Sequence, residues 1–430
     1  MSLPAPLYVV DGVRTPLCKA GTTLAAADAV ELGRTAVAAL LARTGIDPAR
    51  IDEVFFGCVG QPADAANIAR VIALRAGVPE TVPALTVHRN CASGFEAITQ
   101  AADKIAAGRG DLFLVGGTES MSNYPLLYKP ETARKFAGLA KAKTLGQKLA
   151  GSAQFRPADF SPRVSLMLGL TDPVCGLGMG QTAELLARDW RISRDAQDEF
   201  ALESHQRAAA ARARLAEEIT PVYPRGGHEP AAVETDNGVR EGQTMEALAK
   251  LKPVFEKRGG TVTAGNASQV TDGAVALLVA SEAGLKRTGL TPLGRLVDYA
   301  YAGCEPARMG LGPVYAIARL EERNGVRLCD ADLIEINEAF AAQVLACAAA
   351  ATSTEFAREH LGRDTALGDI PDDILNVNGG GIALGHPVGA TGARLVLTAL
   401  KELHRRHERR ALVSLCVGGG QGAALWLETS

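Results

Sequence analysis

Hydrophobic positions in the first third of the chain follow two alternating spacings. Short apolar runs predict buried strands at residues 7–10, 54–56, 85–89 and 111–115. Longer stretches with an apolar residue at every third or fourth position predict helices at residues 24–44, 67–76 and 95–107. Strands that alternate with helices in this way build βαβ units, so the chain is expected to adopt an α/β fold.

Three segments of this region resemble three segments of the C-terminal region in the same order. The pairs are 8–16 with 294–303, 52–57 with 332–338, and 109–119 with 409–421. Short apolar strands resemble one another by chance, so a single pair would carry little weight. Three ordered pairs favour a duplication, in which two α/β units pack face to face and bring matching loops to one cleft.

A long stretch between the two copies breaks the alternation. It is too long for a loop and is expected to form a subdomain over a face of the sheet, with a helical region at 180–218. We therefore expect an N-terminal half at 1–121 that is completed by 258–290. An inserted loop domain at 122–257 and a C-terminal half at 291–430 complete the organisation.

The early part of the insertion is basic. The cations are Lys129, Arg134, Lys135, Lys141, Lys143 and Lys148. A solvated basic face explains such a cluster, and docking of a phosphate-bearing ligand or of a partner subunit is the alternative.

Charge and composition narrow the classes of function. The 430 residues carry 45 Lys and Arg against 48 Asp and Glu, which argues against nucleic-acid and membrane-surface binding, since both need a basic excess. No segment approaches the ~18 apolar residues of a membrane span, and neither a signal peptide nor a peroxisomal tripeptide is evident. The eight cysteines are scattered without zinc-type spacing. We expect a reduced cytoplasmic protein without a metal.

Cys91 differs from the other cysteines in its position. It lies between a predicted strand and a predicted helix, and Ser93 and Gly94 allow the chain to turn. A thiolate at a helix N-terminus is stabilised by the helix dipole and by free N–H groups, so the pKa of Cys91 is expected to fall below ~8.5. Buried cysteines are usually inert, which suits the others except Cys416. Cys91 is the candidate nucleophile.

The stretch NVNGGGIALGHPVGATGAR at 376–394 places His386 among six glycines. Glycine is needed where the backbone takes a positive φ or where another group approaches closely. Histidine exchanges a proton near neutral pH. The segment is therefore interpreted as a working site, rather than as a glycine-rich turn that carries a histidine by chance.

Two further segments carry candidate chemistry at strand ends. Cys416 precedes a glycine-rich turn that includes Gly418, whose free N–H groups suit an oxyanion hole; a tight turn after a buried strand explains the pattern equally well. Asn337 and Glu338 follow a predicted strand at Leu333–Ile336, where open α/β sheets build their sites. A helix N-cap with an acid in the first turn is the structural alternative.

With these residues in place, the sequence resembles the thiolase family over essentially its whole length. Five segments carry the resemblance in family order: VHRNCASGFEA at 87–97, TVTAGNASQVTDGA at 261–274, NEAFAAQ at 337–343, the stretch at 376–394, and CVGGGQG at 416–422. The resemblance implies a duplicated α/β fold with two mixed five-stranded sheets and helices in αβαβα layers. It also implies a loop domain inserted in the first half.

The resemblance further implies roles for the candidate residues. Cys91 would be the acylated nucleophile, His386 the base that activates it, and Cys416 the group that moves the α-proton. Asn337 would hold a water that joins His386 in stabilising the thioester oxygen. The backbone N–H groups of Cys91 and Gly418 would form a second oxyanion hole.

Three other positions match the family near its coenzyme A channel. Ser268 and Met179 would line the channel, and Phe340 would pack near the pantetheine arm. The implied ligands are acyl-CoA and CoA, with CoA as a co-substrate and no bound cofactor.

Three segments resemble the β-subunits of fatty-acid oxidation complexes: KAKTLGQKLAG at 141–151, MEALAKLKPVFEKRGGTVTAGNAS at 245–268 and EFAREHLGRDT at 355–365. Those subunits usually carry His where this chain has Asn337, which weakens the link to a complex. The first expectation is thiolysis of 3-ketoacyl-CoA in fatty-acid β-oxidation by a homodimer or homotetramer. A hydratase/dehydrogenase subunit is a candidate partner.

Other functions remain open at this point. Condensation of two acetyl-CoA to acetoacetyl-CoA is the second expectation. A condensing enzyme like the ketoacyl synthases would typically pair its Cys with two histidines, whereas this chain supplies Cys416 and Asn337. An inactive scaffold subunit would commonly lack one catalytic residue, and all four are present here.

Overall fold

The structure, a computed structural model, describes residues 3–224 and 231–429. The expected outer bounds at residues 1 and 430 therefore lie outside the described residues. The strands of the first half are β1 (Leu7–Arg14), β2 (Cys18–Lys19), β3 (Glu53–Gly57), β4 (Ala84–Val87), β5 (Leu112–Ser120) and β8 (Thr271–Ala280). Those of the second half are β9 (Gly294–Gly303), β10 (Leu333–Ile336), β11 (Arg410–Val417) and β12 (Gln421–Glu428).

The two halves repeat one strand order. The first array runs β4-β3-β5-β8-β1, and the second runs β10-β11-β12-β9. The three pairs of similar segments fall on β1 and β9, β3 and β10, and β5 and β11, which occupy matching places in the two arrays. The α/β class and the internal duplication are confirmed.

The second array departs from the expected five strands. The position that matches β4 holds only an isolated parallel bridge between Ile334 and Leu375. Directly after it, Asn376 takes a left-handed φ of 45° and pairs its side chain with the backbone of Ile336, which ends the ladder. The two arrays are also joined, because β1 pairs with β9 over three residues, so the described strands form one continuous mixed sheet.

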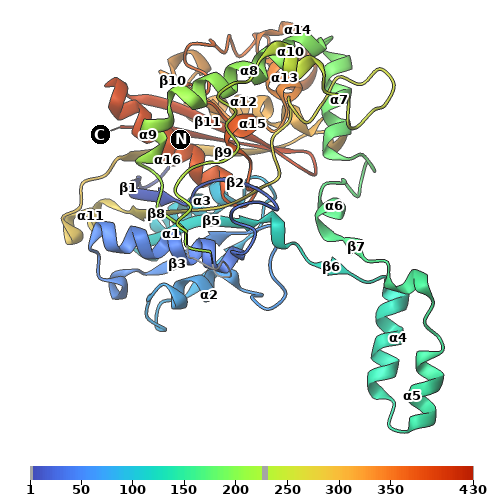
Figure 1. Cartoon of the computed structure of the whole chain (residues 1–430). Coiled ribbons are helices and arrows are strands. Elements are labelled where there is room, and N and C mark those ends of the chain that lie inside the picture. The colour runs from blue at the N-terminus through green and yellow to red at the C-terminus, as the bar shows by residue number, and fades with distance from the viewer. Residues whose placement is uncertain (1–2, 225–230, 430) are drawn as a thin grey trace.

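Alternating side chains on the strands separate three apolar layers. The helices of these layers are α1 (Ala29–Thr44), α2 (Ile68–Arg75), α3 (Ser93–Ala106), α12 (Gly312–Asn324), α13 (Ala341–Thr352) and α16 (Thr391–Arg406). On β5, Phe113 packs with α3 and α16, while Leu114 packs with α1 and α2. On β11, Val413 faces the same middle layer and Leu412 faces α12 and α13. The order is thus αβαβα (Figure 1).

The two central helices, α3 and α16, touch at their N-termini. A Cβ at Gly94 would lie 2.6 Å from the backbone nitrogen of Ala393, and one at Gly392 would lie 2.4 Å from that of Phe95. Glycine is required at both positions for this approach. The contact brings the turn before α3 and the loop before α16 together, and these carry the candidate nucleophile and the candidate base.

The expected helical region at 180–218 is three helices, α7 (Met179–Asp189), α8 (Arg194–Ala210) and α9 (Arg212–Ala216). Arg191 has a φ of 52°, and the Ser193 side chain caps α8 by accepting from Ala196 N, so the helical run is interrupted there. The remaining helices are α4 (Pro130–Lys141), α5 (Leu145–Ser152), α6 (Ser165–Gly169), α10 (Met245–Ala249), α11 (Glu282–Thr288), α14 (Thr354–His360) and α15 (Gly381–Leu384). Short 3₁₀ turns lie at Pro48–Arg50, Met121–Asn123, Pro157–Phe160, Pro306–Leu311 and Leu328–Asp330.

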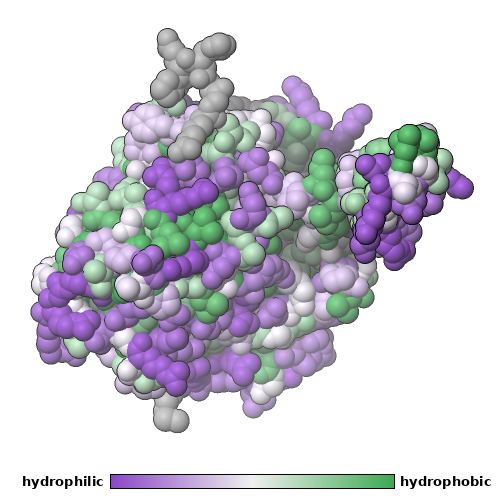
Figure 2. Space-filling view, turned by 90° about the horizontal axis from the view of Figure 1, so that it is seen from below, coloured by the Kyte–Doolittle hydropathy of each residue, from purple (hydrophilic) through white to green (hydrophobic). Residues whose placement is uncertain are grey.

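Part of the insertion stands away from the body instead of covering a face of the sheet. Helices α4 and α5 form a hairpin on a two-stranded stem of β6 (Leu126–Leu127) and β7 (Arg163–Val164) (Figure 1). Phe136 packs on Phe155 inside the hairpin, while Leu145 and Leu149 are exposed. Figure 2 shows apolar surface on the hairpin. Of the basic residues, Lys135 pairs with an acid, Asp159, and the segment after β7 returns to the body.

None of the helices in the described part of the chain is long and apolar enough to cross a membrane.

Candidate active site

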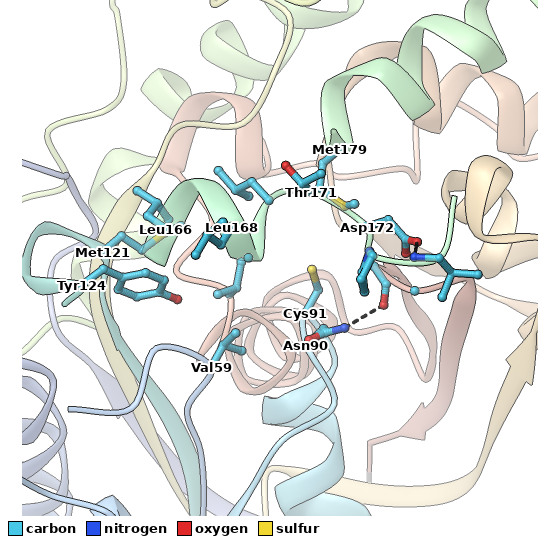
Figure 3. A pocket seen from close by; sticks show the side chains of 17 residues that line it. Val59, Asn90, Cys91, Met121, Tyr124, Leu166, Leu168, Thr171, Asp172 and Met179 are labelled. Atoms are coloured by element: carbon cyan, nitrogen blue, oxygen red, sulfur yellow. Dashed lines mark hydrogen bonds between the residues drawn. The ribbon is translucent and has the colours of Figure 1, made fainter. Parts of the chain in front are cut away.

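Cys91 lies on the wall of a cavity of about 410 Å³ (Figure 3). It occupies the turn between β4 and α3. The Ser93 hydroxyl closes this turn by donating to Asn90 O at 2.7 Å and accepting from Arg89 N at 3.0 Å. Asn90 takes a left-handed φ of 44°, a conformation that Asn tolerates better than most residues. The turn presents the sulfur to the cavity.

The surroundings of Cys91 raise its pKa, contrary to the expectation from its helix N-terminus. Burial raises the pKa of the thiol to about 11, while the backbone N–H groups of Gly418 and of Cys91 itself lower it in part, and the charge of Glu119 raises it. Loss of hydration outweighs the local donors here. The resting thiol is therefore protonated at neutral pH and needs a base, and the same two N–H groups are placed to stabilise negative charge beside the sulfur.

His386 is held as a neutral base with a defined tautomer. Its Nδ1 lies 2.7 Å from the hydroxyl oxygen of Thr391, which donates its own proton to Pro387 O at 3.0 Å. The hydroxyl must therefore accept from Nδ1–H, so Nε2 is unprotonated and is the ring nitrogen that can take a proton. Burial, and then the charge of Arg394, lower the pKa of His386 to about 3, so the ring is uncharged at neutral pH.

Asn337 faces this ring from the end of β10. Its Nδ2 lies 3.4 Å from His386 Nε2. The neighbouring Glu338 is buried and accepts from Ser204 Oγ, Asn376 Nδ2 and Ile382 N, which ties the end of β10 to the glycine-rich segment. The alternative of a helix N-cap is wrong, because α13 begins at Ala341 after Phe340.

Cys416 lies behind the cavity wall. It is 1% exposed and belongs to an apolar cluster with Phe340, against which Met179 packs. Burial raises its pKa well above the ordinary value, and the nearby charge of Cys91 raises it further. Cys416 is thus a protonated thiol at neutral pH, close enough to Cys91 for a charge on Cys91 to affect it.

The three residues expected along the coenzyme A channel lie on neighbouring segments. Met179 lines the cavity, and a Cβ at Gly418 would lie 3.3 Å from its sulfur. Phe340 bridges to Ala267, and the next residue, Ser268, donates its backbone N–H to Ala339 O at 2.9 Å. All eight candidate site residues therefore fall in one region of the molecule.

In residues 3–224 and 231–429, no group of three or more His, Cys, Asp or Glu side chains could hold a metal ion.

Residues 7–283 match the family model "Thiolase, N-terminal domain", and residues 290–429 match "Thiolase, C-terminal domain". The chain belongs to the thiolase family. Similar thiolases include one named 3-ketoacyl-CoA thiolase from Pectobacterium carotovorum subsp. carotovorum, which is 42% identical over 98% of this chain and 96% of its own. Another of that name, from Yersinia enterocolitica, is 40% identical over 100% of both chains.

Solved thiolase structures share the whole fold. The acetyl-CoA acetyltransferase of Bacillus anthracis superposes with a TM-score of 0.86 at 37% identity, covering 99% of each chain. The human mitochondrial 3-ketoacyl-CoA thiolase in complex with CoA superposes with a TM-score of 0.85 at 37% identity, covering 100% of this chain and 99% of its own. The expected thiolase architecture is thereby confirmed.

Three further residues of this thiolase site did not emerge from the sequence. Thr391 sets the tautomer of His386, as described above. Asn90 Nδ2 donates to Gly418 O at 2.7 Å, which holds the Gly418–Gly419 peptide next to the Gly418 N–H (Figure 3). Glu119 is a buried carboxylate that accepts four hydrogen bonds from N–H and O–H donors around the cavity, and a long one from the Cys58 thiol. The contacts of Asn90 with Gly418 and of Gly389 with Glu119 cross between the two halves, and only the adjacency of Asn90 to Cys91 was a sequence signal.

Replacing Asn90 with glycine is expected to lower kcat by about tenfold to a hundredfold with little change in KM. Glycine keeps the left-handed backbone, but the Gly418 carbonyl loses its tether, so the adjoining Gly418 N–H can shift. A misaligned oxyanion donor costs rate more than binding. Steady-state kinetics on wild type and Asn90→Gly measure this. A rise in KM at unchanged kcat would show that Asn90 serves substrate binding instead.

Acid is expected to destabilise the wild type more than the His386→Asn variant. The folded-state pKa of His386 is about 3, and the unfolded-state value is about 6.5, so only the unfolded chain takes up this proton between those values. The free energy of unfolding should fall by about 2 kcal/mol on this account between neutral pH and pH ~5. Urea unfolding at both pH values measures it.

The exposed His360 provides the matched control, because His360→Asn should keep the wild-type pH dependence. Burial also lowers the pKa of His205, to about 4. His205 therefore contributes part of the pH dependence of stability in every variant. If the free energy of unfolding fell by the same amount between the two pH values in wild type and in His386→Asn, this would contradict the assignment of a neutral, buried His386.

Proposed function

We propose that the chain catalyses CoA-dependent cleavage of 3-ketoacyl-CoA to acetyl-CoA and a shortened acyl-CoA, through an acyl thioester on Cys91. The observation that carries this proposal is the neutral His386 with an unprotonated Nε2, in the same site as a protonated Cys91 whose sulfur receives two backbone N–H groups. The names of the full-length relatives from Pectobacterium and Yersinia support the same reaction.

The first half-reaction forms the acyl enzyme. His386 Nε2 takes the proton of the Cys91 thiol, and the thiolate attacks the 3-keto carbon. The bond between C2 and C3 then breaks, and its electron pair goes to C2 as the enolate of acetyl-CoA. Cys416 donates its proton to C2, and acetyl-CoA leaves. The donors at Asn337, His386, Cys91 N–H and Gly418 N–H would stabilise the oxygens that gain charge.

The second half-reaction regenerates the enzyme. The Cys416 thiolate takes the proton of the incoming CoA thiol, and the CoA sulfur attacks the acyl carbon on Cys91. The Cys91 thiolate leaves and recovers its proton from the His386 imidazolium. Each catalytic group ends in its starting protonation state, as a ping-pong cycle requires.

The cavity shape favours cleavage of chains longer than acetoacetyl-CoA. Its volume of about 410 Å³ exceeds what an acetyl group needs, and the lining includes apolar side chains at Val59, Met121, Leu166 and Leu168. Condensation of two acetyl-CoA is the second candidate, supported by the name of the Bacillus anthracis neighbour and by the Asn337 shared with ordinary thiolases.

One assay decides between these functions. Purified protein is given CoA and a series from acetoacetyl-CoA to 3-ketohexadecanoyl-CoA, and acetyl-CoA formation is measured. Cleavage of medium or long chains supports the first proposal. Turnover of acetoacetyl-CoA alone would favour the second proposal. If no substrate were turned over, the hypothesis of an inactive scaffold subunit would be favoured instead.

We also propose that the protein is a cytoplasmic homo-oligomer. Among the described residues, β4 pairs only with β3 and forms the edge of the sheet, and Leu85 on it is 44% exposed. Two copies could pair their sheets there as a homodimer. The α4–α5 hairpin is the candidate contact for a tetramer or for a hydratase/dehydrogenase subunit. The scattered cysteines support a cytoplasmic location.

A further inference from the structure

One end of the cavity is closed by Tyr124. Figure 3 shows this ring beside Met121 and Leu166 on one side of Cys91, with Met179 on the other. The inference rests on the proposed function, which places the pantetheine arm along Met179. The alkyl chain of an acyl group on Cys91 would then extend toward Tyr124.

A buried carboxylate holds the Tyr124 ring in place. The hydroxyl donates to Glu119 Oε1 at 2.9 Å. Glu119 is 0% exposed and also accepts from Gly60 N at 2.8 Å, Gly389 N at 2.9 Å and Val59 N at 3.1 Å. Because three of these four donors are backbone groups from both halves of the fold, the anchor of the hydroxyl is itself fixed.

The backbone at Gly60 supports the ring from behind. A Cβ at this position would lie 1.9 Å from the nearest ring carbon of Tyr124, so the ring rests directly on the main chain and has no room to retreat. The facing wall is different. Leu166 and Leu168 come from α6, a five-residue helix without a side-chain cap, and Leu168 is 40% exposed. The Tyr124 end of the cavity is thus held by the surrounding main chain, whereas the wall formed by α6 has fewer fixed contacts.

We propose that Tyr124 sets the upper limit of acyl chain length, and that Glu119 is the positioning residue that keeps the ring at the end of the cavity. Shorter acyl chains fit between Cys91 and the ring, whereas longer chains meet it. Removal of the ring opens space for further methylenes, each worth about fourfold in affinity when buried.

The test compares chain-length profiles. kcat/KM is measured from acetoacetyl-CoA to 3-ketohexadecanoyl-CoA for wild type, Tyr124→Ala, Tyr124→Leu and Tyr124→Phe. Tyr128→Ala is the matched control, because Tyr128 is 47% exposed, packs on Phe136 and does not line the cavity. We expect Tyr124→Ala to raise the ratio of kcat/KM for the longest substrate to that for acetoacetyl-CoA by at least about tenfold. Tyr128→Ala should keep the wild-type profile within about twofold. Tyr124→Phe keeps the ring on Gly60 but loses the hydrogen bond to Glu119, so it should shift the ratio in the same direction as Tyr124→Ala by a smaller factor. An unchanged Tyr124→Phe profile would overturn the positioning role of Glu119.

The outcomes separate the two proposals. If Tyr124→Ala does not fold, the Tyr124→Leu profile decides, since leucine fills part of the space and should shift the ratio in the same direction by a smaller factor. An unchanged profile in a folded Ala or Leu variant would overturn the role of Tyr124 while the proposed thiolysis stands. If the wild type cleaves no substrate in the series, the proposed function itself fails.

Discussion

Replacing Cys91 with alanine is expected to lower kcat for thiolysis by at least about 10⁴-fold. In the proposed mechanism the Cys91 sulfur forms the acyl bond, and removal of a nucleophile abolishes the covalent route altogether. The remaining donors at Gly418 and His386 bind charge but have no acyl group to act on. Acetyl-CoA formation from a 3-ketoacyl-CoA and CoA measures the loss.

Cys329 supplies the control for this substitution. It is an exposed free cysteine, so Cys329→Ala removes the same atom from the surface and should keep wild-type activity. Circular dichroism and thermal unfolding should show both variants folded. If folded Cys91→Ala retained more than about a hundredth of wild-type kcat, Cys91 would not be the nucleophile.

Replacing Cys416 with alanine is expected to slow carbon–carbon cleavage much more than acetyl exchange. Protonation of the C2 carbon needs an acid, so kcat for carbon–carbon cleavage should fall by about 10³-fold or more. Exchange of an acetyl group between CoA and Cys91 needs no carbon protonation and should fall far less. The raised pKa of Cys416 agrees with this role, because it keeps the thiol protonated until the enolate forms.

The measurement pairs two assays on the same variant. Cleavage is followed by acetyl-CoA formed from a 3-ketoacyl-CoA, and exchange by the label that passes from free CoA into acetyl-CoA. Cys416→Ser should resemble Cys416→Ala, since a hydroxyl is a weaker acid than a thiol. An equal fall in both assays would show that Cys416 only supports the structure around Cys91.

Much of the fold could be predicted from the sequence because buried strands and amphipathic helices leave periodic patterns. The strand at Leu333–Ile336 has the predicted bounds, and the three similar segment pairs occupy matching strands. The start of the first helix was misplaced, because Leu24 continues the apolar pattern and is buried without being helical. Asp28 caps α1 by accepting from Glu31 N, so the helix begins at Ala29.

The glycines after the strand predicted at 111–115 show a different limit. The predicted strand ended before them, but Gly116 and Gly117 lie inside β5, which continues to Ser120. A Cβ at Gly117 would lie 1.9 Å from Gly389 O. Glycine is therefore needed here because it leaves room for the loop before α16. A close approach between distant segments leaves no local pattern, and a turn is the default interpretation of two glycines.

Some features of the candidate site could be predicted from the sequence, and others depend on contacts between distant segments. Cys91, His386 and Cys416 were predicted because their residue types and their neighbouring glycines are unusual locally. The pKa of Cys91 was predicted in the wrong direction, since burial by the second half of the fold is invisible in the turn itself. The contacts of Asn90 with Gly418 and of Glu119 with Gly389 join residues hundreds of positions apart, and only the folded chain shows them.

The mass of the intact protein after brief treatment with acetoacetyl-CoA, in the absence of free CoA, tests the central claim most directly. The wild type should gain the mass of one acetyl group, and peptide mapping should place it on Cys91. Cys91→Ala should gain nothing, and Cys329→Ala should gain as much as the wild type. An unmodified wild type, or equal modification of Cys91→Ala, would contradict the proposed acyl enzyme.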